Sequence, residues 1–211
     1  MADLKNLAAA LMKGDAPAVE KMTREAIDAG TDPKQVLDDG LIAGMQVVGE
    51  QFKNNEIYVP EVLIAARAMQ AGMKVLEPIL VKAGIKPVAT IAMGTVRGDL
   101  HDIGKNLVSM MMRGNGFKVL DLGIDVTPEK FVEAARNEDV RLIGMSALLT
   151  TTMPSMKATI EELLKAGLLG RVKVLIGGAP ITQRYADEIG ADGYAPDAAS
   201  AVDTAKALVG L

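Results

Sequence analysis

After residue 87 the sequence alternates short apolar runs with amphipathic segments, and this alternation constrains the fold more than any other feature. Runs of strand length that alternate with segments of helical periodicity are typical of consecutive β-α units around a parallel sheet. Strands are expected at residues 88–93, 117–122, 140–146, 172–176 and 192–195. Helices are expected at residues 103–114, 128–137, 153–166, 181–189 and 197–209. We predict an α/β fold of the doubly wound, flavodoxin-like (Rossmann-like) kind, with a five-stranded parallel sheet in the order 2-1-3-4-5.

The first part of the chain lacks strand signals and has the periodicity of helices. Four apolar stripes recur at helical spacing, and Asp32-Pro33 is a typical helix start with proline in the first turn. Four helices with short connections predict a small four-helix bundle. The periodicity changes directly after residues 84–87, and so we expect a helical cap domain at residues 1–86 and an α/β domain at residues 87–211.

Composition limits the classes of protein and partner. The 211 residues include no cysteine, which excludes disulfides, thiolate metal sites and a cysteine nucleophile. The formal net charge of −4 lies in no long block, and so nucleic acid is not expected as a partner. A secretory signal and an apolar run of the roughly 18 residues that span a membrane are both lacking. We therefore expect a cytoplasmic protein with no membrane partner.

The nonapeptide at residues 98–106 (GDLHDIGKN) connects the first expected strand to the first helix of the α/β region. In doubly wound sheets, ligands are usually held at this edge. His101 is the only histidine of the chain, and imidazole is a common ligand of transition metals. Asp99 is the nearest carboxylate that could fix the tautomer of that imidazole. His101 is therefore a candidate metal ligand, although a lone histidine is more often an ordinary polar residue.

Two further loops are expected beside the nonapeptide because of the predicted strand order. Ser146 ends the third strand, and Gly177-Gly178 follow the fourth. Paired glycines permit the close approach of a flat or bulky ligand. The three loops together offer an imidazole, a carboxylate, a hydroxyl and an open slot. Each feature also has a local interpretation, in which Ser146 caps a helix and the glycines form a plain turn.

Three other chemistries fit these residues less well. The nonapeptide differs from a phosphate-binding loop in its glycine spacing, and Asp99 and Asp102 would repel a phosphate. A phospho-receiver domain would have an aspartate at the position of Ser146. A zinc hydrolase would need more ligands than one histidine and no cysteine can supply.

The spaced motifs resemble those of the cobalamin-binding domains of corrinoid methyltransferases. The segments Asp99-Leu100-His101-Asp102-Ile103-Gly104, Ser146-Ala147-Leu148 and Gly177-Gly178 match the three motifs of that family and the separations between them. In the helical half, Gly49-Glu50-Gln51-Phe52 and Glu56-Ile57-Tyr58-Val59-Pro60 are similar to the cap domain of cobalamin-dependent methionine synthase. The resemblance covers nearly the whole chain.

The resemblance implies a cobalamin or related corrinoid as cofactor, with His101 bound to cobalt in place of the cofactor's own lower base (base-off, His-on). It also implies a hydrogen bond between Asp99 and His101 and another between Ser146 and Asp99. Further cofactor contacts, many of them along the displaced nucleotide tail, are implied for Gly98, Leu100, Asp102, Ile103, Gly104, Ser146, Leu148, Thr150, Gly177, Gly178, Tyr194 and Ala198. Residues of the helical cap that would shield the upper face of the ring are Phe52, Val59 and Val62. The first two are equally plausible as bundle core.

The function that the resemblance implies is that of a methyl carrier, the non-catalytic corrinoid subunit of a multi-component methyltransferase. Its expected partners are a substrate-specific methyltransferase, an acceptor methyltransferase that uses tetrahydrofolate or a thiol, and a protein for reductive activation. A corrinoid-binding sensor or regulator is one alternative, and it would need an output module. The small subunit of an adenosylcobalamin mutase is another, but that class is not expected to have the helical cap.

Overall fold

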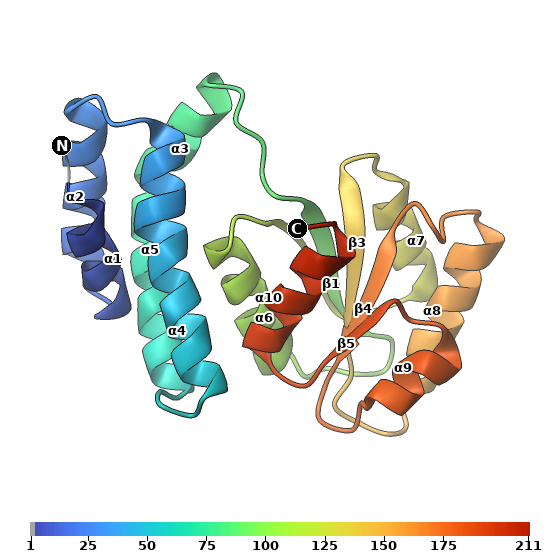
Figure 1. Cartoon of the computed structure of the whole chain (residues 1–211). Coiled ribbons are helices and arrows are strands. Elements are labelled where there is room, and N and C mark those ends of the chain that lie inside the picture. The colour runs from blue at the N-terminus through green and yellow to red at the C-terminus, as the bar shows by residue number, and fades with distance from the viewer. Residues whose placement is uncertain (1–2) are drawn as a thin grey trace. The chain divides into compact units, whose positions relative to one another are not determined.

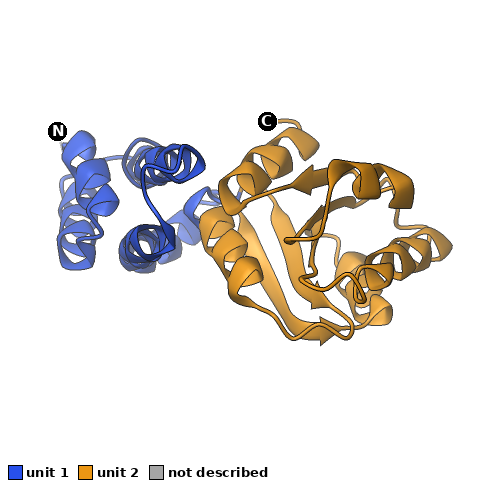
Figure 2. Cartoon of the chain, turned by 90° about the horizontal axis from the view of Figure 1, so that it is seen from below, with its two compact units in different colours: residues 1–87, 114–116 blue, residues 88–113, 117–211 orange. Residues whose placement is uncertain are grey.

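The computed structural model describes residues 3–211 (Figure 1). Residues 1 and 2, with which the expected helical domain begins, lie outside the described residues. The chain forms two compact units, which are coloured separately in Figure 2. The helical unit comprises the residues up to 87 together with 114–116, and the α/β unit comprises residues 88–113 and 117–211.

The helical unit has the four successive helices that the sequence predicts. Its elements are α1 (Leu4–Met12), α2 (Ala16–Asp28), α3 (Pro33–Gln35), the π-helical segment η1 (Val36–Ile42), α4 (Ala43–Lys53) and α5 (Val59–Lys82). The short α3, η1 and α4 follow one another without a break, and together they form the third expected helix. Asp15 and Asp32 cap the starts of α2 and α3, because each side chain accepts a hydrogen bond from a backbone N–H of the first turn. Buried side chains that form the core of this unit include Leu7, Leu11, Val19, Leu41, Met45 and Leu76.

The α/β unit confirms the predicted fold class and strand order. Its strands are β1 (Thr90–Val96), β2 (Lys118–Val126), β3 (Val140–Ser146), β4 (Lys173–Gly177) and β5 (Gly193–Ala195). Its helices are α6 (Ile103–Gly114), α7 (Pro128–Arg136), α8 (Pro154–Lys165), α9 (Gln183–Ile189) and α10 (Ala198–Leu208). In the described part of the chain the strands form a five-stranded sheet in the order β2-β1-β3-β4-β5, and each neighbouring pair is parallel.

Helices cover both faces of this sheet, with α6 and α10 on one face and α7, α8 and α9 on the other (Figure 1). β1 is buried along its whole length, as a central parallel strand must be. The core against α7 and α8 is built around Phe131, Met156, Ile160 and Leu163. Because all five strands are parallel, the loops that follow them lie at one edge of the sheet, where the candidate site residues of this unit gather.

Among the described residues, no helix combines the length and the apolar character that crossing a membrane requires.

Candidate functional site

The sheet register brings the predicted strand-end residues into one row. Thr95 of β1 is paired with Ser146 of β3, and Ser146 is in turn paired with Gly177 of β4. Gly177 is paired with Ala195 of β5, which completes the row at this edge. Ser146 and Gly177 therefore lie side by side, as the predicted strand order requires.

Asp99 and His101 form a close pair in the loop between β1 and α6. The carboxylate Oδ1 of Asp99 lies 2.7 Å from the imidazole Nδ1 of His101 and also accepts a hydrogen bond of 3.0 Å from the backbone N–H of His101. The Asp99 side chain is completely buried, whereas the His101 side chain is 51% exposed. A half-exposed ring beside a buried carboxylate is thus the central feature of the loop.

The second carboxylate oxygen of Asp99 is bound by the loop that follows β3. Oδ2 accepts hydrogen bonds from Leu148 N at 2.7 Å, Leu149 N at 3.3 Å and Thr152 Oγ1 at 2.8 Å. These bonds connect residues about 50 positions apart in the chain. Asp99 therefore holds the β1–α6 and β3–α8 loops together as well as orienting the histidine.

The charge of Asp99 determines the tautomer of His101. Burial raises the pKa of Asp99, but the hydrogen bonds from Leu148, His101 and Thr152 outweigh burial and hold this pKa well below its usual range. An ionised carboxylate can only accept hydrogen bonds, so that Nδ1 of His101 must be the donor. In the neutral ring, Nε2 then carries the free lone pair, which is the state in which an imidazole binds a metal.

The expected hydrogen bond between Ser146 and Asp99 is replaced by one from Thr152. Among the described residues no hydrogen bond joins Ser146 to Asp99, and the hydroxyl that reaches the carboxylate belongs to Thr152, which is buried. The Ser146 side chain starts at the end of β3, while the chain bends after Leu148 and brings Thr152 back over Asp99. The sequence analysis did not identify Thr152, because no local pattern in the sequence indicates that the chain bends back towards Asp99 after β3.

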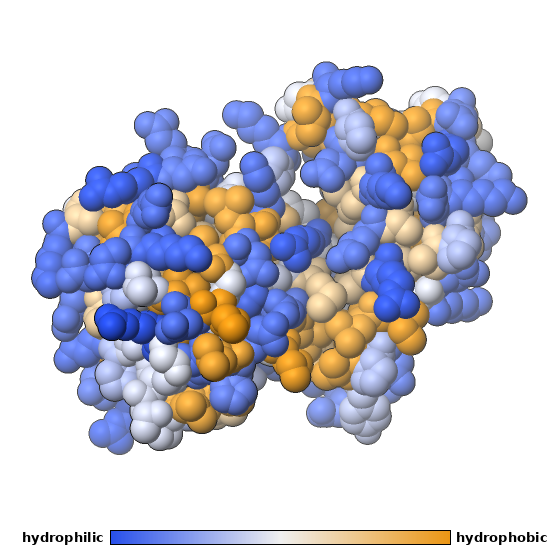
Figure 3. Space-filling model, turned by 180° about the vertical axis from the view of Figure 1, so that it is seen from behind, coloured by the Kyte–Doolittle hydropathy of each residue, from blue (hydrophilic) through white to orange (hydrophobic). Residues whose placement is uncertain are grey.

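The two loops that Asp99 connects also carry large exposed apolar side chains. Leu100 and Ile103, on either side of His101, are 67% and 78% exposed, and Leu148 and Leu149 of the β3–α8 loop are also exposed. Figure 3 shows apolar surface interspersed with charged side chains on the α/β unit. Exposed apolar side chains that gather beside polar groups are typical of a binding site for a largely apolar ligand. Asp102 and Thr150 are exposed polar residues of the same two loops.

The predicted glycines divide into two kinds. A Cβ atom at Gly104 would meet no heavy atom within 4 Å, so the space beside this residue is open. At Gly178 the backbone φ is +133°, and a Cβ atom would lie 1.9 Å from the carbonyl oxygen of Ala147. At Gly177 it would lie 3.0 Å from the carbonyl oxygen of Ala195. The sequence predicts an open slot at Gly177 and Gly178. At Gly178 this prediction is wrong in part, because the backbone of Ala147 occupies the space where a side chain would lie.

The remaining predicted residues differ in exposure. Tyr194 of β5 is partly buried, and Ala198 at the start of α10 is buried. In the helical unit, Phe52 and Val59 are partly exposed, whereas Val62 is fully buried and offers no surface in this conformation. Whether these residues of the helical unit face a cofactor stays a prediction.

Residues of β2 and α6 that the sequence did not single out also contact the loop. Asp125 Oδ1 accepts a hydrogen bond of 2.7 Å from Gly98 N. The ammonium of Lys105, only 2% exposed, lies 2.7 Å from Asp121 Oδ1. Burial raises the pKa of Asp121, but Lys105 and the backbone N–H of Gly123 outweigh it and keep this pKa below its usual value. No periodicity marks these carboxylates, because β2 is an edge strand with many exposed residues.

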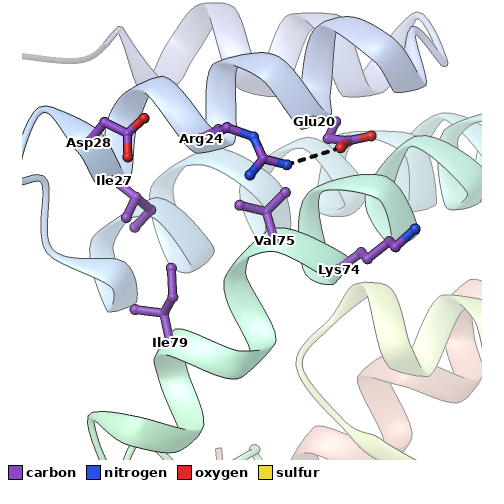
Figure 4. A pocket seen from close by; sticks show the side chains of 7 residues that line it. All are labelled: Glu20, Arg24, Ile27, Asp28, Lys74, Val75 and Ile79. Atoms are coloured by element: carbon purple, nitrogen blue, oxygen red, sulfur yellow. Dashed lines mark hydrogen bonds and ion pairs between the residues drawn. The ribbon is translucent and has the colours of Figure 1, made fainter.

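A pocket of about 270 Å³ in the helical unit is separate from these residues (Figure 4). Its lining comes from α2 and α5 and consists of Glu20, Arg24, Ile27, Asp28, Lys74, Val75 and Ile79. Arg24 forms an ion pair of 3.2 Å with Glu20 at its rim. None of the predicted site residues lines this pocket, so it has no part in the site described above.

A family model described as a B12 binding domain matches residues 89–203, and a second model with the same description matches residues 3–77. The chain is 42% identical to a corrinoid protein of Desulfitobacterium hafniense, over 100% of this chain and 99% of that protein. It is 45% identical to trimethylamine corrinoid protein 1 of Methanosarcina mazei, over 90% of this chain and 88% of the relative.

A solved structure shows the same fold. The chain superposes on a chain of the methanol:cobalamin methyltransferase complex MtaBC from Methanosarcina barkeri with a TM-score of 0.85 and 33% sequence identity. The match covers 96% of this chain and 78% of the other.

Proposed function

Because this chain belongs to the family of corrinoid proteins built on B12-binding domains, we propose that it is a methyl carrier that serves two separate methyltransferases. The cofactor predicted from the sequence, a cobalamin or related corrinoid, is confirmed by this membership. When bound, such a cofactor supplies a cobalt centre that can take up and release a methyl group. The protein's own task is to hold that centre, tune it and present it.

The observation that carries the proposal is the half-exposed His101 ring with its Nδ1 bound to the buried Asp99. This donor set fits the cofactor, because a single oriented imidazole can serve as the axial ligand of a metal whose other ligands belong to a macrocycle. The exposed side chains of Leu100, Ile103 and Leu148 offer apolar contact to one face of the ring. In this arrangement His101 would bind cobalt through Nε2 and replace the cofactor's own base.

The displaced nucleotide tail would then enter the α/β unit beside His101. Gly104 supports this route because the space beside its Cα is open. We propose that the tail passes the residues at the sheet edge and the start of the last helix, namely Gly104, Ser146, Leu148, Thr150, Gly177, Gly178, Tyr194 and Ala198.

The helical domain, residues 1–86, would act as a cap on the upper face of the ring. Phe52 and Val59 support this role because both are apolar and partly exposed. The cap would have to move during the reaction cycle, since it cannot both shield the methyl group and present it to two partners.

The cap is tested by photolysis of bound methylcobalamin. We expect faster photolysis in Phe52→Ala and no change in Val81→Ala, because Val81 is an exposed apolar residue of the same unit. Equal photolysis in all three proteins would contradict the cap.

The proposed partners are a methyltransferase specific for the methyl donor, a second methyltransferase for the acceptor and a reductive activation protein. Two matches support the first of these: one relative is named a trimethylamine corrinoid protein, and one similar structure is titled a methanol:cobalamin methyltransferase complex. The acceptor enzyme and the activation protein follow from the chemistry of a carrier, which must be unloaded and kept reduced.

The function is tested with the purified chain loaded with methylcobalamin. His101→Gly should change the absorption spectrum to that of base-off methylcobalamin while the cofactor stays bound, because the axial nitrogen is lost. A spectrum unchanged from the parent would show that His101 is not the axial ligand. Methyl transfer is measured separately, by incubating the loaded parent with a panel of acceptor methyltransferases, each supplied with tetrahydrofolate or a thiol as methyl acceptor, and following demethylation of the cofactor. Failure of every enzyme to demethylate the cofactor would contradict the carrier function.

A further inference from the structure

The edge strand β2 is irregular at two places beside the candidate site. Its register with β1 shifts between Met93 and Gly94 and again between Gly94 and Val96. Gly123 and Asp125 have positive φ values of +87° and +51°. For a residue other than glycine this backbone conformation is uncommon, although aspartate and asparagine tolerate it better than most. Bulges of this kind often redirect a side chain next to a functional site.

The irregular end of β2 directs Asp125 onto the loop that carries His101. The carboxylate Oδ1 of Asp125 accepts a hydrogen bond of 2.7 Å from Gly98 N, and the backbone N–H of Asp125 donates one of 3.1 Å to the carbonyl of Asp99. Asp125 thus binds the backbone of Gly98 and of Asp99, at the start of the loop that carries His101.

The middle of β2 holds the other end of the same loop. Asp121 Oδ1 lies 2.7 Å from Lys105 Nζ, and Lys105 belongs to the first turn of α6. The same oxygen accepts a hydrogen bond of 3.0 Å from Gly123 N, within the first irregular segment. The loop between these two anchors has little apolar packing of its own, since Leu100 and Ile103 point largely into solvent.

We propose that Asp125 is a positioning residue for His101, which acts with the Lys105–Asp121 ion pair to fix both ends of the β1–α6 loop against β2. Asp99 sets the rotation of the imidazole through the side chain, whereas β2 sets the place of the backbone from which the ring projects. The inference rests on the proposed function, in which Nε2 of His101 must reach the cobalt of a bound corrinoid. A ligand atom displaced by a fraction of an ångström binds a metal less well, so loss of an anchor should weaken ligation without touching the ligand.

Two substitutions at one position separate the carboxylate from the backbone conformation. Asp125→Gly accepts the positive φ but removes the acceptor for Gly98 N. Asp125→Asn also tolerates the positive φ and retains an oxygen that can accept this hydrogen bond. Asp139→Asn is a charge control, because Asp139 is exposed and precedes β3, at the opposite edge of the sheet.

Ligation is measured by electron paramagnetic resonance of the Co(II) form of bound cobalamin in protein labelled with ¹⁵N-histidine. Since His101 is the only histidine, nitrogen splitting that responds to the label reports this residue alone. In Asp125→Gly we expect the ratio of His-ligated to unligated cobalt to fall between about twofold and about tenfold, the range for one lost hydrogen bond. Asp125→Asn and Asp139→Asn should retain the parent ratio. A parent ratio in Asp125→Gly, or an equal loss in Asp125→Asn, would overturn the inference.

A second measurement uses the protein without cofactor. In ¹H–¹⁵N spectra of the His101 ring, Asp125→Gly should shift or broaden the ring signals relative to the parent and Asp125→Asn. If the parent itself shows no His-ligated cobalt, the proposed function fails in its axial ligand, and these spectra still decide whether Asp125 positions the loop. Ring signals in Asp125→Gly identical to those of the parent would contradict that role.

Discussion

The imidazole Nδ1 of His101 lies 2.7 Å from the carboxylate Oδ1 of Asp99, and the first side chain is half exposed while the second is completely buried. The buried carboxylate orients the His101 ring through Nδ1, while the exposure of the ring leaves Nε2 accessible. The carboxylate also accepts hydrogen bonds from the loop after β3, so the same group that orients the ring connects two loops of the α/β unit. Orientation of the candidate ligand and stability of the site should therefore change together.

Asp99→Asn should destabilise the protein even without a cofactor. The amide replaces one acceptor oxygen with an NH₂ donor, which leaves a buried donor such as Leu148 N without a partner. We expect the free energy of unfolding at neutral pH to fall by about 2 to 3 kcal/mol, measured by urea denaturation.

The difference in free energy of unfolding between the parent and Asp99→Asn should depend on pH. Burial raises the pKa of Asp99, yet the hydrogen bonds to its carboxylate outweigh burial. In the folded protein the pKa of Asp99 is therefore lower than its value of about 3.9 in an unfolded chain. The carboxylate therefore contributes stability above the unfolded pKa, and this contribution is lost as the pH falls towards the folded pKa. The gap between parent and Asp99→Asn should be constant above about pH 5 and should narrow below about pH 4. A gap that stays constant into the acid range would contradict the assigned ionisation.

Thr152→Val should cost more stability than Ser146→Ala. The valine cannot donate to Asp99 Oδ2, which Thr152 Oγ1 approaches to 2.8 Å, whereas Ser146 makes no hydrogen bond to that carboxylate. We expect a loss of about 1 to 2 kcal/mol for Thr152→Val and less than about 0.5 kcal/mol for Ser146→Ala. Thr152→Ser, which keeps the hydroxyl, is the conservative control. Equal losses of stability in Thr152→Val and Ser146→Ala would contradict the assignment of this hydrogen bond to Thr152.

Gly178→Ala should disrupt the sheet edge itself. Its Cβ atom would lie 1.9 Å from Ala147 O, and its φ of +133° disfavours any side chain. Gly190→Ala is the matched control, because Gly190 also has a positive φ of +76° but nothing lies within 4 Å of its Cβ position. We expect Gly190→Ala to lose about 1 to 2 kcal/mol and Gly178→Ala to lose clearly more or to fail to fold, as judged by circular dichroism and thermal unfolding. Equal thermal midpoints for the two variants would exclude the collision.

Gly104→Ala should separate binding from folding. This position lies in the first turn of α6 with open space beside it, and alanine is the better helix former by up to about 1 kcal/mol. The variant should be as stable as the parent or more stable, while its affinity for cobalamin falls because the methyl group enters the proposed path of the nucleotide tail. Affinity is measured by titration of the protein without cofactor. Unchanged affinity would move the path of the tail away from Gly104.

The sequence by itself determined the features that depend on residues close together in the chain. The change of periodicity near Pro87 marks the passage from helices to β-α units, and the capping aspartates Asp15 and Asp32 start helices as expected. The contact between Asp99 and His101 is also local, since two residues separated by one position in a tight loop can meet without help from the rest of the fold. The parallel strand order followed from the alternation of strands and helices, which leaves few ways to bury every apolar face.

Only the tertiary structure decided which distant groups meet at the site. The hydroxyl on Asp99 comes from Thr152 because of the way the chain bends after β3, and the backbone of Ala147 occupies the space beside Gly178. Asp125 reaches Gly98 from the end of β2, where the register with β1 shifts. A periodic pattern records which face of an element is buried, but it does not record register shifts or loop returns. Those depend on the packing of the completed sheet, and they determine how firmly the loop of His101 is held.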